Sequence, residues 1–154
     1  TVSFKKMKIS SALTISICAA LIASCSSLPD TPVAVETLSE GEQSEPVDIA
    51  FTGVTDVNFS KIIIAPGAGT GPHCHYGNVI GLIEEGELTH YAPTHSGGVY
   101  VYGPGESLVE GSGYVHEGVN EGSTDVVLYV TYMTPDGRPL AEKDLSNCDE
   151  SEES

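Results

Sequence analysis

Residues 67–75 read Gly-Ala-Gly-Thr-Gly-Pro-His-Cys-His, and the expected fold can be inferred from this segment and its surroundings. Glycine and proline interrupt regular structure just before the two histidines. Side chains two residues apart in an extended strand lie on the same face, so His73 and His75 are predicted to project together. Paired imidazoles on one face suit a divalent metal ion. Cys74 has the opposite parity and is predicted to point away from them.

A third histidine, His116, follows His75 after the glycine-containing stretch Gly111-Ser-Gly-Tyr-Val. Around these histidines, short apolar runs alternate with Gly and Pro turns, and no segment keeps a helical period. Such a pattern predicts a β-sandwich or a barrel. The expected strands are residues 57–65, 79–83, 88–92, 99–102, 107–110, 115–119 and 126–133.

The spacing of the glycines and histidines resembles that of two motifs in the cupin superfamily. The first motif has a glycine, five residues, a His-x-His pair and a closing glycine, and the second has two glycines, a histidine and an asparagine. The resemblance covers about residues 55–134 and implies an all-β fold, a single-domain antiparallel barrel of the jelly-roll type. The matching residues are Gly67, His73, His75 and Gly86 in the first motif and Gly105, Gly113, His116 and Asn120 in the second.

Two positions depart from the family's pattern. Gly111 stands where a proline is usual, which loosens a turn. Cupins normally hold one metal ion with three histidines and a glutamate, but Val79 stands where the first motif would place that glutamate. The resemblance therefore implies a site of three histidines, which is a competent set of ligands for zinc. The predicted metal ligands are His73, His75 and His116.

Another carboxylate could replace the missing glutamate. Glu106 and Glu110 lie on the expected strand before His116 and share a face, so either could point into the barrel. A solvated or turn position is the more common place for such a residue. His90 and His95 fit neither motif: His90 is expected to face solvent or a neighbour, His95 to lie in an exposed hairpin loop, and neither is assigned to the site.

The expected cofactor is one divalent metal ion, with iron, manganese, zinc and nickel as candidates. The cupin resemblance spans dioxygenases, isomerases, lyases and decarboxylases, so it implies a small-molecule enzyme without selecting the reaction or a catalytic residue. A non-catalytic module that binds a small ligand or the metal is the alternative. A barrel whose histidines no longer bind metal is a third interpretation. Exposed strand edges also make a homodimer an open alternative to a monomer.

The first residues are predicted to be an export signal rather than part of the fold. A basic head, residues 5–8, precedes an uncharged and largely apolar run of about 15 residues, shorter than the roughly 20 of a transmembrane helix. The run ends on Ile-Ala-Ser-Cys, which resembles a bacterial lipobox. This predicts a signal peptide over residues 1–24 and a lipid anchor at Cys25, with Ser26 typical of the outer membrane of the cell envelope. A buried N-terminal helix is the alternative.

The remaining organisation follows from composition. Residues 25–46, rich in Pro, Ser and Glu, are expected to be the lipidated cysteine and a flexible linker. Residues 47–140 are the predicted barrel, and residues 141–154 are an acidic tail expected to be disordered. In an exported protein, Cys74 and Cys148 could form a disulfide or remain free thiols.

The charge of the chain excludes some classes of partner. It has 6 basic and 22 acidic residues, which gives a formal net charge of −16. This sign argues against nucleic-acid binding and against docking on anionic lipid through a basic patch. The expected contact with a membrane is therefore through the lipid anchor alone, and the expected partner is a small-molecule ligand or substrate.

Overall fold

The computed structural model describes residue 33, residues 35–51 and residues 53–149. The predicted signal peptide, Cys25 and residues 150–154 lie outside the described residues. The chain divides into two compact units, Thr1–Val35 and Glu36–Ser154, and the strands found among the described residues belong to the second. In the part of the chain that is described, no helix has the length and apolar character needed to cross a membrane.

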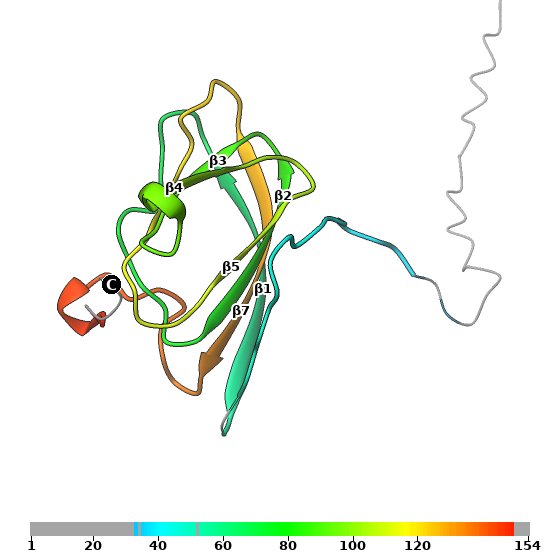
Figure 1. The fold of residues 1–154 in the computed structure, drawn as a ribbon. Helices are drawn as coiled ribbons and strands as arrows, with labels where there is room; N and C mark the ends of the chain where they lie inside the picture. The colour runs from blue at the N-terminus through cyan, green and yellow to red at the C-terminus, as the bar shows by residue number, and fades with distance from the viewer. Residues whose placement is uncertain (1–32, 34, 52, 150–154) are drawn as a thin grey trace, which may run out of the picture. The chain divides into compact units, whose positions relative to one another are not determined.

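Seven antiparallel strands form two sheets in the described part of the chain (Figure 1). One sheet has the strand order β1-β7-β2-β5, and the other has the order β4-β3-β6. This confirms the prediction of an all-β antiparallel barrel. The strands are β1 (Thr55–Ile64), β2 (Asn78–Glu85), β3 (Leu88–Tyr91), β4 (Val99–Tyr102), β5 (Ser107–Glu110), β6 (Glu117–Val119) and β7 (Val126–Pro135), with short 3-10 turns η1 (Ser96–Gly98) and η2 (Leu145–Asn147).

Strand β7 organises the larger sheet. It pairs with β1 along the whole length of both strands, from Thr55 opposite Pro135 to Ile64 opposite Val126, and its other edge pairs with β2. Alternate residues of β1 face the interior, as expected for a strand with one face on the core. The core consists of the buried side chains of Ile64, Val79, Ile83, Leu88, Leu108, Val126, Leu128 and Val130.

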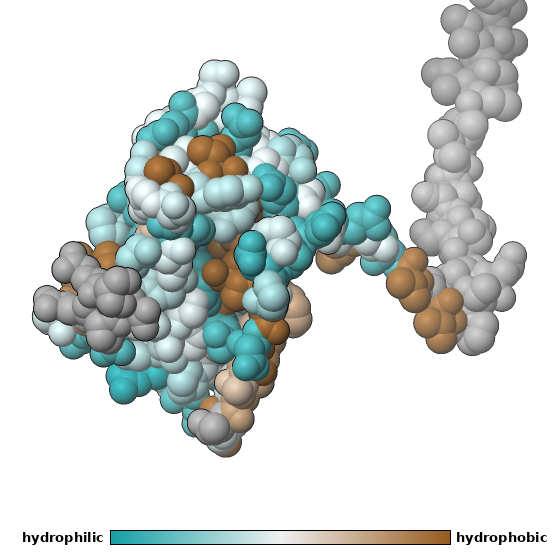
Figure 2. All heavy atoms as spheres, viewed as in Figure 1, coloured by the Kyte–Doolittle hydropathy of each residue, from teal (hydrophilic) through white to brown (hydrophobic). Residues whose placement is uncertain are grey.

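The outward face of β1 is strongly apolar. Val57, Phe59 and Ile63 are all largely exposed on it. Figure 2 shows apolar residues along the lower right of the barrel, where Figure 1 places β1. These exposed apolar side chains interrupt the acidic surface that the composition indicates. The strand that carries them, β1, is also at the edge of its sheet.

Asn120, the last residue of the second motif, has a structural role. Its side-chain amide donates hydrogen bonds to the carbonyl oxygens of Ile64 at 2.7 Å and Thr124 at 2.8 Å. Its Oδ1 accepts a hydrogen bond from the backbone of Gly122 at 3.0 Å. These bonds satisfy a fully buried amide and fasten the end of β1 to the loop that precedes β7.

The closing glycine of the first motif also has a structural reason. Gly86 turns the hairpin between β2 and β3 with a φ of +77°. A Cβ there would lie 2.5 Å from the carbonyl oxygen of Asp125, closer than any real side chain allows. Glycine is therefore required both by the left-handed backbone and by the close approach of the neighbouring loop.

The last residues of the predicted flexible linker join the barrel. Glu42 forms a parallel bridge with Glu106: its backbone N–H donates to the carbonyl of Gly105 at 2.8 Å, and its carbonyl accepts from Ser107 at 2.9 Å. The structure thus corrects the linker prediction for this part of residues 25–46. The physical reason is that β5 is an edge strand and offers unpaired backbone groups to the passing chain.

The acidic tail is likewise held against the barrel. The backbone of Glu142 pairs with that of Cys74, and Cys74 forms a disulfide with Cys148. The backbone of Asp149 then donates to the carbonyl of Gly113 at 2.9 Å. The prediction of disorder over residues 141–154 is therefore wrong up to residue 149, and the structure selects the disulfide over two free thiols.

Candidate metal centre

The structure brings the three predicted histidines together inside the barrel. His73 and His75 lie between β1 and β2, and His116 lies just before β6. His73 and His116 face each other across an antiparallel bridge, with backbone hydrogen bonds of 3.0 and 2.9 Å. The ring centroids are 4.4–4.9 Å apart, all three side chains are buried, and their ligand atoms lie within 4.8 Å of one another.

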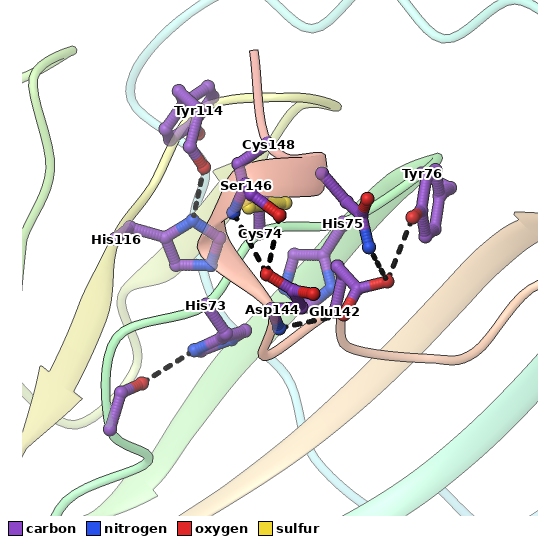
Figure 3. The surroundings of a disulfide bond; sticks show 12 residues. His73, Cys74, His75, Tyr76, Tyr114, His116, Glu142, Asp144, Ser146 and Cys148 are labelled. Atoms are coloured by element: carbon purple, nitrogen blue, oxygen red, sulfur yellow. Dashed lines mark hydrogen bonds between the residues drawn. A yellow bond between two sulfur atoms is a disulfide. The ribbon is translucent and has the colours of Figure 1, made fainter. Parts of the chain in front are cut away.

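Cys74 points away from this cluster, as its parity predicted. Figure 3 shows its sulfur bonded to Cys148, on the side of this segment where the acidic tail runs. Cys74 is therefore neither a ligand nor a free nucleophile, and the disulfide anchors the tail directly between the two histidines of the first motif.

Each of the three rings is held by a contact between its Nδ1 and a backbone carbonyl. Figure 3 shows the contact between His116 and the carbonyl of Tyr114. A carbonyl oxygen can only accept, so Nδ1 carries a proton, and a ring with one proton then has its lone pair on Nε2. Buried metal-binding histidines are commonly oriented in this way. The carbonyls are those of Gly71 for His73 at 2.8 Å, Leu140 for His75 at 2.6 Å and Tyr114 for His116 at 3.2 Å.

Glu110 provides a carboxylate to this cluster. Its Oε2 lies 3.0 Å from Nε2 of His75 and 3.4 Å from Nε2 of His116. In the pairing of β2 with β5, Glu110 stands directly opposite Val79, the position where the family's glutamate would be. Side chains directly opposite each other on neighbouring strands point to the same face of a sheet. A carboxylate on β5 therefore reaches the interior that a glutamate on β2 would otherwise reach.

Glu106, the other carboxylate considered from the sequence, is not part of the cluster. It lies before the first residue of β5, and its carboxylate accepts hydrogen bonds from the backbone of Gly103 at 2.6 Å and the hydroxyl of Tyr100 at 3.1 Å. Only Glu110 of the pair meets the imidazoles.

His90 also belongs to the cluster, which corrects the expectation that it faces solvent or lies outside the site. Its side chain is 2% exposed, and its Nε2 lies 3.0 Å from Oε1 of Glu110. On the other side of the ring, its Nδ1 lies 2.8 Å from Nε2 of His95. His95 is half-buried rather than exposed and reaches the cluster through His90. The parity that His90 shares with the core residue Leu88 was the signal in the sequence that could have placed it inside.

Burial and charge act against each other in this cluster. Burial lowers the pKa of His73 to about 4, and the neighbouring imidazoles lower it as well. The hydrogen bond to the carbonyl of Gly71 acts in the opposite direction but is outweighed. Burial alone would raise the pKa of Glu110, but contacts with His116, His75 and His90 hold it well below its usual range. Burial also opposes a charge on His116, yet Glu110 raises the pKa of that ring above its ordinary value. The carboxylate is therefore ionised, and either a proton on His116 or a metal cation can balance its charge.

The residues present fit a divalent metal ion. The Nε2 atoms of His90 and His116 are buried and have no hydrogen-bond partner in the described structure, although both lie beside Glu110. A buried polar group without a partner costs about 1–3 kcal/mol, and coordination of an ion removes that cost. Imidazole nitrogens with one carboxylate are a donor set suited to zinc, iron, manganese or nickel.

A cavity of about 40 Å³ adjoins the cluster. Since a water molecule needs roughly 10–15 Å³ of such space, the cavity admits water or a molecule of a few heavy atoms. Tyr132 lines it, and burial together with Glu110 raises the pKa of this phenol, so its hydroxyl stays protonated. The apolar part of the wall comes from Ile62, Ile64, Leu88, Leu108, Leu128 and Val130.

Comparison with known proteins places this fold. Residues 60–132 match the family model of the cupin domain. Among solved structures, oxalate oxidase is 31% identical over 49% of this chain and 40% of its own, with a TM-score of 0.43. A predicted oxalate decarboxylase from Thermotoga maritima is 26% identical over 49% of this chain and 64% of its own, with a TM-score of 0.43. An RmlC-like cupin from Shewanella frigidimarina is 21% identical over 53% of this chain and 68% of its own, with a TM-score of 0.45.

The chain thus spans less than two thirds of the length of oxalate oxidase and of the Thermotoga maritima protein. No curated protein matches the sequence. The family match agrees with the two glycine-histidine motifs and the pair of antiparallel sheets, and residues 60–132 of this chain are therefore a cupin domain.

Proposed function

We propose that this protein binds one divalent metal ion inside the barrel through His73, His75 and His116, with Glu110 as the carboxylate ligand. The observation that carries the proposal is the grouping of three buried imidazoles beside one buried carboxylate. Lone pairs and a carboxylate oxygen repel each other in a buried site unless a proton or a cation lies between them. One divalent ion satisfies all of these groups together.

The proposed use of the site is catalysis on a small molecule, of the dioxygenase, isomerase or lyase type. When bound, the ion would supply Lewis-acid or oxygen-activating chemistry. The protein's own part is to exclude water with the apolar wall and to keep Glu110 ionised beside the imidazoles. Tyr132 offers a protonated hydroxyl on the wall of the cavity, where it can donate a hydrogen bond to a bound molecule.

A non-catalytic module that stores or senses metal is the second candidate, and the small size of the cavity favours it. The two functions differ in whether the bound ion keeps an exchangeable water. Relaxation of solvent protons by bound Mn²⁺ measures this directly: fast-exchanging water supports the enzyme, and its absence supports the storage or sensing module.

Metal content tests the site itself. The full chain, purified in detergent and reconstituted with zinc, is expected to retain about one equivalent of the ion by mass spectrometry. His116→Ala removes one proposed ligand and is expected to lose the ion, whereas His95→Ala leaves the proposed ligands in place and should retain it at saturating metal. An equal metal content in wild type and His116→Ala would contradict the proposal.

We also propose that the protein is exported and attached to the bacterial envelope by lipid at Cys25. The order of basic head, apolar run and lipobox-like sequence supports this, and a disulfide is typical of proteins outside the cytoplasm. Cys25→Ser is expected to move the protein from the membrane fraction to the soluble fraction. Cys18→Ser, within the apolar run, is the matched control and should stay with the membrane. Retention of Cys25→Ser at the membrane would contradict lipidation.

A further inference from the structure

His90 lies outside both histidine motifs, yet its ring is arranged like those of the three predicted ligands. It is held on the Nδ1 side by a neighbouring group, here Nε2 of His95 at 2.8 Å. Its Nε2 is directed at Glu110, 3.0 Å from Oε1. The side chain is 2% exposed, so no solvent can satisfy that nitrogen.

The Nε2 of His90 is one of the buried atoms without a hydrogen-bond partner in the described part of the chain. Its distance from Glu110 is short, but the contact lacks the geometry of a donated hydrogen bond. Ligand atoms of His90, Glu110 and His116 lie within 4.8 Å of one another, a second group of potential ligands that shares His116 with the first. An Nε2 that donates no proton to the carboxylate beside it has its lone pair available for a cation.

We propose that His90 is a further protein ligand of the ion, so that four imidazoles and one carboxylate hold it. This rests on the metal binding proposed above. His90 donates its Nδ1–H to Nε2 of His95, which leaves the lone pair of its own Nε2 for the metal. His95 is then a positioning residue that fixes the tautomer of His90.

Glu110 connects the two groups of ligands. Its Oε2 is directed at His75 and His116, and its Oε1 is directed at His90. Five protein donors leave at most one position on an ion that accepts six ligands. This agrees with a cavity of about 40 Å³, and it restricts any molecule that reaches the ion to attachment through a single atom.

Cobalt provides a direct count of the imidazole ligands. In the full chain loaded with Co²⁺, each histidine bound through Nε2 contributes one exchangeable, strongly shifted proton resonance from its Nδ1–H. We expect four such resonances in the wild type and three in His90→Gln. His95→Gln is the matched control: its amide oxygen can still accept the proton of His90, so four resonances should remain.

Three resonances in both the wild type and His90→Gln would overturn the inference, because His90 would then act only through Glu110. A wild type that binds no cobalt would overturn the proposed metal binding itself, which is a different result. The wild-type count needs no substitution, so it decides the question even where His90→Gln fails to fold.

Discussion

Glu110→Val is expected to lower the affinity for zinc by at least about 100-fold, the upper end of what loss of an outer partner of a ligand costs. Glu110 is the one carboxylate found in the cluster of described residues, and its Oε2 lies within 3.4 Å of two of the proposed imidazole ligands. Removing it takes away both a ligand and the negative charge that attracts the cation. Isothermal titration of the full chain with zinc measures the change.

Glu106→Val is the matched control for this substitution. Glu106 also precedes His116, but it binds Gly103 and Tyr100 instead of an imidazole, so zinc affinity should be unchanged. An equal loss of affinity in both variants would show that surface charge, and not a ligand, had been removed.

A second substitution can restore what Glu110→Val removes. Val79 stands directly opposite Glu110 and lines the same cavity, so Val79→Glu in the Glu110→Val background places a carboxylate on the neighbouring strand. Zinc affinity is expected to return to within about 10-fold of the wild type. A folded double variant without recovered affinity would contradict the interpretation that the β5 carboxylate replaces one on β2.

Cys148→Ser is expected to lower the free energy of unfolding by about 2–4 kcal/mol. The Cys74–Cys148 disulfide joins residues 74 positions apart, and closing such a long loop restricts the unfolded chain. Urea unfolding of the oxidised protein measures the loss.

The same substitution should also weaken zinc binding, by a smaller factor than Glu110→Val. The carbonyl of Leu140, on the tail segment that leads to Cys148, lies 2.6 Å from Nδ1 of His75. The segment keeps its backbone pairing between Glu142 and Cys74 without the disulfide, so the loss is partial. A reductant should reproduce both effects in the wild type. If reduction left the urea midpoint unchanged, the disulfide would not contribute to stability.

The strands and the grouping of three histidines could be predicted because local pattern determines them. Alternation along β1 and the glycine turns located the strands, and the spacing of the two motifs predicted that His73, His75 and His116 would meet. Parity suggested Glu106 and Glu110 as replacements for the missing glutamate, but it could not show which of the two points into the barrel. The boundary of β5 does so, because Glu106 lies just before the strand, where it bridges to Glu42, and Glu110 lies within it.

Other features of the site depend on contacts that sequence pattern does not encode. His90 fits neither motif, so only its parity with Leu88 pointed to the interior, and parity does not show that the ring meets Glu110. The acidic composition of the tail predicted disorder, since composition does not reveal that Cys148 reaches Cys74.

The pairing of Val79 with Glu110 bears on how a family's signature can be written. A signature is a string, and a string treats residues 31 positions apart as unrelated. A sheet is a two-dimensional lattice, in which opposite residues on neighbouring strands have Cβ atoms about 4.5–5.5 Å apart and face one volume. A carboxylate can therefore stand at a different position in the sequence and still lie in the same part of the fold. A signature that requires the glutamate on β2 excludes this chain. A signature that accepts a carboxylate at either of two paired positions on neighbouring strands would include it.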